Sequence, residues 1–261
     1  MKAIILAAGQ GTRLKKYTEN LPKGMLSFAG KTIIERQIEI YRRNGIQDII
    51  IVRGYEADKI TYEDVKYYTN AEYNSTNMVE SLLTARSELD DDTIVSYSDI
   101  LFSDAMLKGM MNAKENFVVA VDKTWQEYWT MRYGRADFDT ESLELNNAGN
   151  IVSLGLPDVS PDKIDARYVG ILKFSKEGLA AILEIMNQNY EEYLNKPWKQ
   201  SGKTIRQAYM TDLLQAVIEA GKDVKAQIFY HGWIEFDTNE DYEKACEWAD
   251  NGEIKKLIEL A

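Results

Sequence analysis

The residues best suited to chemistry lie near the start of the chain. An apolar run at residues 1–7 ends in a polar turn that contains Gly9 and Gly11, and the basic residues Arg13 and Lys23 follow. Glycine lets successive backbone N–H groups curl around an anion without a Cβ in the way. Arginine and lysine supply the positive charge that a polyphosphate requires. We interpret this segment as a cradle for a nucleoside triphosphate.

Two aspartates stand out by their positions. Asp99 follows the apolar run 93–97, and Asp237 follows the run 233–236. Both are expected at the carboxyl ends of strands, the edge of the sheet at which the glycine turn also opens. Two carboxylates that face a triphosphate suit Mg²⁺, which binds one or two carboxylates together with phosphate oxygens and water. The alternative for each aspartate is that it caps the helix that follows.

Composition removes several classes of site. With one histidine, His231, and one cysteine, Cys246, zinc sites built from several His or Cys ligands are excluded. A Ser-His or Cys-His device would have to use His231, for which a structural role is expected. An internal disulfide is impossible with a single cysteine, and this usage predicts a cytoplasmic protein. The chemistry must therefore depend on carboxylates, Lys, Arg and a metal.

Length and charge limit the partners. The chain has 261 residues and a net charge of −11, which argues against a nucleic-acid partner. No apolar run is long enough for a membrane span, so no membrane association is expected. We predict a single domain over residues 1–261, with a small acceptor-binding subregion at about 122–212. At a phosphate site, local basic residues and a divalent metal must overcome the negative field of the whole chain.

The periodicity of the sequence predicts the elements that position these residues. Strand 1–7, helix 32–44 and strand 48–52 form a right-handed βαβ unit, so the sheet starts parallel. Further strands are expected at 66–69, 93–97, 117–121, 167–174 and 225–229, and a hairpin at 142–154. Further helices are expected at 76–87, 105–114, 177–193, 205–220 and 239–260, whereas segment 122–135 follows no clear period. The prediction is an α/β sandwich with a mostly parallel sheet and mixed late strands.

The string LAAGQGTRL…LPKGML, residues 6–26, resembles the signature of nucleotidyltransferases that activate sugar phosphates and other small phosphorylated compounds. A Walker motif is absent, which argues against P-loop chemistry. The resemblance implies a three-layer α/β sandwich with a mostly parallel mixed sheet, Rossmann-like and similar to the GT-A fold. It also implies that Gly9 and Gly11 bind the triphosphate, that Arg13 holds the leaving pyrophosphate and that Lys23 contacts the reacting phosphates.

Two further segments resemble the metal motifs of this family. They are SYSDILF at residues 96–102 and WIEFDTNEDYEKA at residues 233–245. By this resemblance Asp99 and Asp237 are the ligands of Mg²⁺. Sugar-1-phosphate members carry a Glu-Lys-Pro element where residues 152–157 here read VSLGLP. This difference makes the chain more similar to the phosphocholine-type and phosphonate cytidylyltransferases.

The resemblance implies CTP as co-substrate and a small phosphorylated or phosphonylated acceptor, of the phosphocholine, aminoethylphosphonate or phospho-amino-acid type. Asn77 and Ser81 would meet the base or ribose, and Arg53 and Gly54 would edge the base pocket. The full set of residues expected at the nucleotide is Leu6, Ala7, Ala8, Gly9, Gly11, Arg53, Gly54, Asn77 and Ser81.

The acceptor site is expected among aromatic and charged residues of the middle segment. Trp125, Trp129 and neighbouring tyrosines would form a wall for a cationic ligand, closed by Asp212 or Glu235. Alternatively, these aromatics cover the core or a dimer contact. A carboxylate on the acceptor would instead pair with Arg132, Lys173 or Arg206. The residues expected at the acceptor are Trp125, Trp129, Arg132, Tyr168, Asp212 and Glu235.

The leading hypothesis is therefore a Mg²⁺-dependent cytidylyltransferase that serves cell-surface polysaccharide or lipid decoration. One alternative is a sugar-1-phosphate nucleotidyltransferase that uses UTP, GTP or dTTP. The other is a nucleotide-sensing regulatory subunit without turnover, against which the joint presence of Arg13, Lys23, Asp99 and Asp237 argues. The aromatic residues are compatible with a homodimer.

Overall fold

The structure is a computed structural model that describes residues 1–260. Its centre is a nine-stranded mixed sheet with the strand order β5-β4-β1-β6-β11-β8-β12-β10-β9. These strands are β1 (Lys2–Ala7), β4 (Ile49–Arg53), β5 (Lys66–Thr69), β6 (Thr93–Tyr97), β8 (Phe117–Asp122), β9 (Glu141–Leu145), β10 (Asn150–Pro157), β11 (Arg167–Phe174) and β12 (Val224–Phe229).

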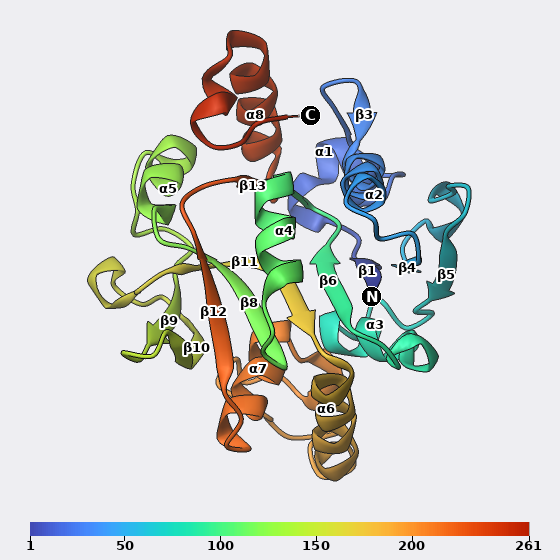
Figure 1. The fold of residues 1–261 in the computed structure, drawn as a ribbon. Helices are drawn as coiled ribbons and strands as arrows, with labels where there is room; N and C mark the ends of the chain where they lie inside the picture. Colours follow the sequence, from blue (N-terminus) through green and yellow to red (C-terminus); the bar gives the residue numbers. More distant parts are fainter. Residues whose placement is uncertain (261) are drawn as a thin grey trace.

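The order and direction of the strands confirm the mostly parallel mixed sheet. Strands β5, β4, β1 and β6 run parallel to one another. Strand β11 is inserted antiparallel between β6 and β8, and β12 lies parallel to β8. The β9–β10 hairpin, which was predicted, forms the edge opposite β5 (Figure 1).

Helices cover the sheet on both faces (Figure 1). They are α1 (Lys15–Thr18), α2 (Ile33–Arg43), α3 (Met78–Thr84), α4 (Asp104–Asn112), α5 (Trp125–Tyr133), α6 (Lys176–Asn189), α7 (Met210–Glu219) and α8 (Asn239–Asn251). Along β1, Ile5 joins a core that includes side chains of α2, α4 and α8, whereas Ile4 joins a core that includes side chains of α3, α6 and α7. Successive strand residues point to opposite faces, so both faces are buried and the three-layer sandwich is confirmed.

Local capping signals explain where two of these helices begin. Thr32 caps α2 in a capping box with Glu35, and the helix is followed by Gly45 with a φ of 90°. Thr238 caps α8 in the same way with Asp241. Helix α3 is capped by Asn77, whose side chain accepts a hydrogen bond from the Met78 N–H.

The segment without a clear period contains a helix, α5. Its buried residues are Trp125, Tyr128, Trp129 and Arg132, which is the spacing of one helix face. A charged residue on the buried face hides this pattern, because the periodicity argument counts apolar residues only. The helix expected at 205–220 is also shorter, with a 3-10 turn at Ile205–Gln207 before α7.

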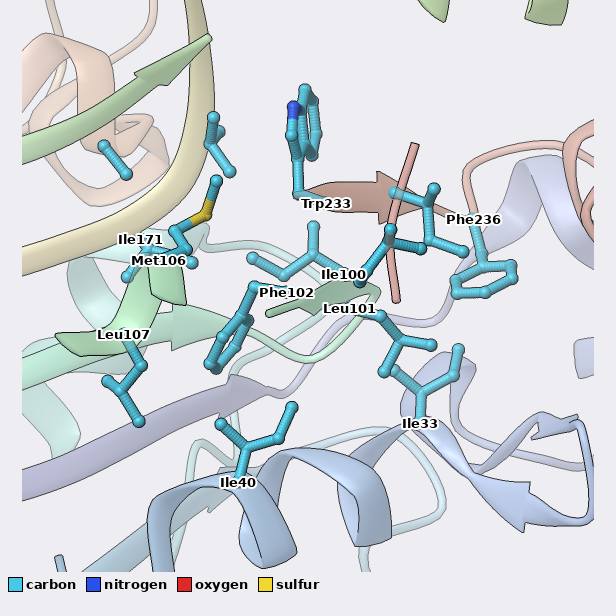
Figure 2. Close-up of a cluster of buried hydrophobic side chains, with 14 of the residues drawn as sticks. Ile33, Ile40, Ile100, Leu101, Phe102, Met106, Leu107, Ile171, Trp233 and Phe236 are labelled. Carbon is cyan, nitrogen blue, oxygen red and sulfur yellow. The ribbon is translucent and has the colours of Figure 1, made fainter. Parts of the chain in front are cut away.

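A second, two-stranded sheet pairs β7 (Ile100–Phe102) with β13 (Trp233–Glu235) in antiparallel fashion. Figure 2 shows its apolar side chains packed with Ile33 and Ile40 of α2 and with Met106 and Leu107 of α4. This packing joins two segments that are far apart in the sequence, and each of them borders one of the two aspartates. A short β2–β3 pair (Ser27–Phe28 and Lys31–Thr32) precedes α2. Among residues 1–260, we find no helix with the length and apolar character of a membrane span.

Candidate active site

The glycine turn after β1 is shaped by two close approaches. Gly11 has a φ of 66°, and a Cβ on it would lie 3.2 Å from the Cβ of Lys23. A Cβ on Gly54, after β4, would lie 2.6 Å from the carbonyl oxygen of Ala8. Both positions therefore require glycine, one for its positive φ and one for space. The Thr18 hydroxyl donates a 2.9 Å hydrogen bond to the Gly11 carbonyl and closes the turn.

A cavity of about 310 Å³ opens above this turn. It is lined by Leu6, Ala8, Gly9, Gly11, Arg13, Lys23, Tyr73, Thr76, Asn77, Met78, Ser81, Tyr97, Ser98, Asp99, Glu235 and Asp237. Most residues expected at the nucleotide and the metal thus lie around one space. Asn77 and Ser81 reach it from the first turn of α3, where Ser81 accepts a 3.1 Å hydrogen bond from the Asn70 amide.

Lys23 lies between the two aspartates. Its Nζ donates hydrogen bonds of 2.6 Å to Asp99 Oδ2 and 2.7 Å to Asp237 Oδ1. The next residue, Gly24, permits this approach, because a Cβ there would lie 2.9 Å from the Cβ of Ser98. The two carboxylates and the ammonium group therefore form one compact charged cluster at the carboxyl end of β6.

The charges in this cluster favour the ionised forms of Lys23 and Asp237. Burial by itself would lower the pKa of Lys23, but the charges of Asp99 and Asp237 outweigh it and raise that pKa. Burial by itself would raise the pKa of Asp237, but Lys23 and Arg13 outweigh it and lower that pKa. Arg13 Nη2 lies 2.6 Å from Asp237 Oδ2, and its side chain is 60% exposed. The Arg13 side chain is therefore accessible to a phosphate in the cavity.

A buried arginine supports the segment that carries Asp237. Arg132 is 1% exposed and donates hydrogen bonds of 2.8 and 2.7 Å to the two carboxylate oxygens of Asp241, and another to Glu235. Asp241 Oδ2 in turn accepts hydrogen bonds from the backbone N–H groups of Thr238, at 2.8 Å, and Asp237, at 3.3 Å. Arg132 therefore orients the backbone at Asp237 through Asp241.

A second cavity of about 500 Å³ adjoins the first. The two cavities share Arg13, Met78, Tyr97, Glu235 and Asp237. The remaining lining residues of the second are Asp139, Thr140, Glu141, Pro157, Arg167, Tyr168, Val169, Gly170, Tyr209 and Thr211. Gly170 has a φ of 87°, and a Cβ on it would lie 2.8 Å from the ring of Tyr97. This glycine lets the Tyr97 ring lie against β11, where the hydroxyls of Tyr168 and Tyr97 are 2.9 Å apart.

Of the residues expected at the acceptor, the structure brings Tyr168 and Glu235 to this cavity. Trp125 and Trp129 are 1% and 0% exposed and belong to the core, so the expected aromatic wall is not formed by the described residues. Here the alternative expectation, that these aromatics cover the core, describes the structure. Asp212 caps α7, where it accepts a 2.9 Å hydrogen bond from the Tyr209 N–H. Arg132 is used in the Asp241 network.

Three of the residues expected at the nucleotide also lie elsewhere. The Arg53 guanidinium donates to the carbonyls of Ala57 and Ile60 and stacks on the Tyr67 ring at 4.2 Å, so it points away from the cavity. Ala7 is buried in the core, and Gly54 supports the turn without lining the cavity.

The other candidates for binding a carboxylate are engaged too. Lys173 donates to the carbonyls of Ala113 and Glu115, and Arg206 pairs with Glu72.

Several lining residues carry little sequence signal. Tyr97 and Ser98 directly precede Asp99, so the predicted strand at 93–97 could have placed them at this edge of the sheet. Glu141, Arg167 and Thr211 are far apart in the sequence and come together from β9, β11 and α7. No spacing rule connects them, because only the packing of the β9–β10 edge against α7 brings them to one cavity.

Comparison with known proteins agrees with this geometry. Residues 3–153 match the family described as the MobA-like NTP transferase domain. The chain is 34% identical to the CTP:phosphoglutamine cytidylyltransferase of Campylobacter jejuni, over 95% of this chain and 100% of that protein. It is 35% identical to the choline-phosphate cytidylyltransferase of Streptococcus pneumoniae, over 59% of this chain and 68% of that protein.

Solved structures show the same fold. The CTP:phosphocholine cytidylyltransferase of Streptococcus pneumoniae superposes with a TM-score of 0.74 at 23% identity, covering 95% of this chain and 98% of that one. The inositol-1-phosphate CTP transferase of T. maritima gives a TM-score of 0.69 at 21% identity, covering 99% and 97%. The chain therefore belongs to the MobA-like NTP transferase family and is a nucleotidyltransferase.

Proposed function

We propose that this protein transfers CMP from CTP to a small phosphorylated or phosphonylated acceptor and releases pyrophosphate. The observation that carries the proposal is the cluster of Lys23, Asp99 and Asp237 beside the glycine turn. The choice of CTP rests on the relatives, among them the cytidylyltransferases of Campylobacter jejuni and Streptococcus pneumoniae.

The donor set suits a divalent cation. Asp99 and Asp237 already hold one cation, the Lys23 ammonium, at hydrogen-bond distance. Within residues 1–260, no three His, Cys, Asp or Glu side chains are grouped to hold a metal by themselves. Two carboxylates with the remaining positions left for phosphate oxygens and water are the coordination that Mg²⁺ favours. Mg²⁺ bound there would neutralise charge on the reacting phosphates.

The residues of the chain then have distinct tasks. An oxygen of the acceptor phosphate forms a bond to the α-phosphorus of CTP, and the bond from that phosphorus to the bridging oxygen breaks, so that pyrophosphate leaves with both electrons of this bond. Lys23 stabilises charge at the reacting phosphates, while Arg13 and the N–H groups of the glycine turn hold the pyrophosphate. A general base is not required, because the acceptor phosphate is already ionised near neutral pH. Asn77 and Ser81 contact the nucleoside.

The proposal is tested by measuring pyrophosphate release from CTP, UTP, GTP and dTTP, with and without Mg²⁺. The acceptors are phosphoglutamine, phosphocholine, inositol 1-phosphate and glucose 1-phosphate. We expect CTP-dependent, Mg²⁺-dependent release that falls by about 100-fold or more in Asp99→Asn. Asp250→Asn, an exposed change on α8, is the matched control and keeps full activity.

Two other outcomes would overturn the proposal. A preference for UTP, GTP or dTTP with glucose 1-phosphate would identify a sugar-1-phosphate nucleotidyltransferase. Binding of CTP without pyrophosphate release from any pair of substrates would identify a regulatory subunit. The cytoplasmic location and the homodimer stay predictions from the sequence.

A further inference from the structure

Of the charged side chains that line the second cavity, two have neither a task in the proposed transfer nor an ion-pair partner within 4 Å. They are Glu141, the first residue of β9, and Arg167, the first residue of β11. We propose that these two residues bind the amino-acid end of a zwitterionic acceptor, with Arg167 on its α-carboxylate and Glu141 on its α-ammonium. This assignment rests on the proposed CMP transfer and names the class of acceptor, a phosphorylated amino acid.

The other charges that line this cavity are already paired. Arg13 forms ion pairs with Asp237 and, at 3.9 Å, with Asp139, and Glu235 is paired with Arg132. Among the described residues, Glu141 and Arg167 are the lining charges that have no ion-pair partner within 4 Å. An acceptor that brings one negative and one positive group would satisfy both.

Arg167 is held in position to bind a carboxylate. Its guanidinium carbon lies 4.4 Å from the centroid of the Trp129 ring, and its Nη1 donates a 3.0 Å hydrogen bond to the carbonyl of Asp139. Stacking and this single bond orient the guanidinium, while most of its five N–H donors stay available. A planar fork of donors is the arrangement that binds a carboxylate through two hydrogen bonds.

Glu141 is suited to a cation. Its Oε1 accepts a 3.3 Å hydrogen bond from the Thr211 hydroxyl. Burial raises the pKa of Glu141, and Arg167 and Thr211 oppose this shift only in part. An ammonium group beside such a carboxylate stabilises its ionised form, because it supplies an opposite charge and donates hydrogen bonds.

The position of the pair relative to the reacting centre supports the same class of acceptor. Arg13 and Asp237 line both cavities, so the second cavity leads from the proposed phosphate site to Glu141 and Arg167. A phosphorylated amino acid has its phosphate and its zwitterionic end at opposite ends of a short chain. A choline headgroup would leave Arg167 without a partner. The acceptor in the name of the Campylobacter jejuni relative, phosphoglutamine, belongs to the favoured class.

The test compares acceptors that differ by one charged group. The first set is glutamine phosphorylated on its side-chain amide, and the corresponding phosphoramidates of 4-aminobutanamide, which lacks the carboxylate, and of 4-carbamoylbutanoic acid, which lacks the ammonium. The second, shorter set is L-phosphoserine, phosphoethanolamine and 3-phosphooxypropanoate. We expect kcat/KM to fall roughly 10- to 100-fold when either charged group is missing, in at least one set.

Substitutions assign each preference to its residue. Arg167→Met is expected to bring the ratio of kcat/KM with and without the carboxylate close to one, through the KM for the acceptor. Glu141→Gln is expected to bring the ratio of kcat/KM for acceptors with and without the ammonium group close to one. Neither substitution is expected to change the KM for CTP. Arg135→Met, an exposed arginine paired with Asp137, is the matched control. Thermal unfolding of each variant shows that the fold is kept.

The failure of this proposal is distinct from the failure of the proposed function. If the wild type releases pyrophosphate from CTP but uses the analogues of both sets as well as the amino acids, the acceptor assignment is wrong and the transfer stands. Preferences that persist in Arg167→Met and Glu141→Gln would also overturn it. If no acceptor supports release, the proposed function itself fails, and this inference falls with it.

Discussion

Asp99 and Asp237 are joined through the backbone, because the N–H of Phe236 donates a 2.9 Å hydrogen bond to the carbonyl of Asp99. This bond continues the β7–β13 pairing, in which Glu235 lies opposite Ile100. The separation of the two carboxylates is therefore set by the register of a small antiparallel sheet whose side chains are buried among α2 and α4 (Figure 2). A site built on paired strands keeps its geometry better than one built on free loops.

Lys23 balances the charge of both carboxylates, and Lys23→Met removes this balance. We expect pyrophosphate release to fall by about 100- to 1,000-fold, because a positive charge at the reacting phosphates is lost. In the absence of metal, the pKa of Asp237 rises in the variant, since Lys23 holds it down in the wild type.

Mg²⁺ should then stabilise Lys23→Met more than the wild type, because the ion no longer competes with an ammonium group. The measurement is the change in thermal midpoint on adding Mg²⁺. Lys196→Met, an exposed lysine paired with Glu192, is the control. Equal stabilisation of variant and wild type would argue against a metal between the two carboxylates.

The two glycines of the turn should respond differently to alanine. Gly11 has a φ of 66°, so Gly11→Ala is expected to lower the free energy of unfolding by about 1–2 kcal/mol. A Cβ on Gly9 meets no atom within 4 Å, so Gly9→Ala should change stability by less than about 0.5 kcal/mol. Because Gly9 lines the first cavity, the same change should raise the KM for CTP. Urea unfolding measures the stability of the two variants, and steady-state kinetics measures the KM for CTP. A Gly11→Ala variant as stable as the wild type would contradict the requirement for glycine at this position.

Arg132 neutralises Asp241 and Glu235 inside the protein. Arg132→Met leaves both carboxylates without their partner, and we expect a loss of about 3–5 kcal/mol in the free energy of unfolding. Arg132→Lys keeps the positive charge but loses the paired hydrogen bonds to Asp241. Its free energy of unfolding should therefore lie between those of the wild type and Arg132→Met.

The kinetic effect separates positioning from stability alone. Because Asp241 accepts from the N–H groups of Asp237 and Thr238, the Mg²⁺ concentration for half-maximal rate should rise in Arg132→Lys under conditions where this variant is fully folded. An unchanged Mg²⁺ requirement would show that Arg132 serves stability only.

Glu88 gives a pH-dependent contribution to stability. Hydrogen bonds from Lys2, and also from Lys66 and Tyr68, lower the pKa of Glu88 from 4.5 to about 2. A lowered folded-state pKa adds stability above the unfolded pKa and loses it as the pH falls toward the folded value. Glu88→Gln should therefore be about 1 kcal/mol less stable than the wild type at pH 7. Urea unfolding at intervals from pH 7 to pH 3 should show this difference narrowing below about pH 4.5; a constant difference would exclude the mechanism.

The glycine turn, its basic residue and the two aspartates could be predicted from the sequence, because their signals are local. A glycine turn after a buried strand, a basic residue within the turn, and aspartates directly after strands each depend on neighbours in the chain. The resemblance of LAAGQGTRL…LPKGML to a family signature added roles for these residues. The capping boxes at Thr32 and Thr238 are equally local.

The residues that line the second cavity could not be predicted in this way. Trp125 and Trp129 were expected at the ligand, but they face the core because α5 buries its aromatic side together with Arg132. Glu141 and Arg167 were not singled out, because each begins a strand and has no periodic or motif signal.

The sequence by itself thus determined the glycine turn and the positions of the two aspartates beside it, since strand, turn and charge follow one another within a few residues. Only the tertiary structure decided which charges line the second cavity. Antiparallel insertion of β11 and the packing of the β9–β10 edge against α7 bring together residues that no spacing rule connects.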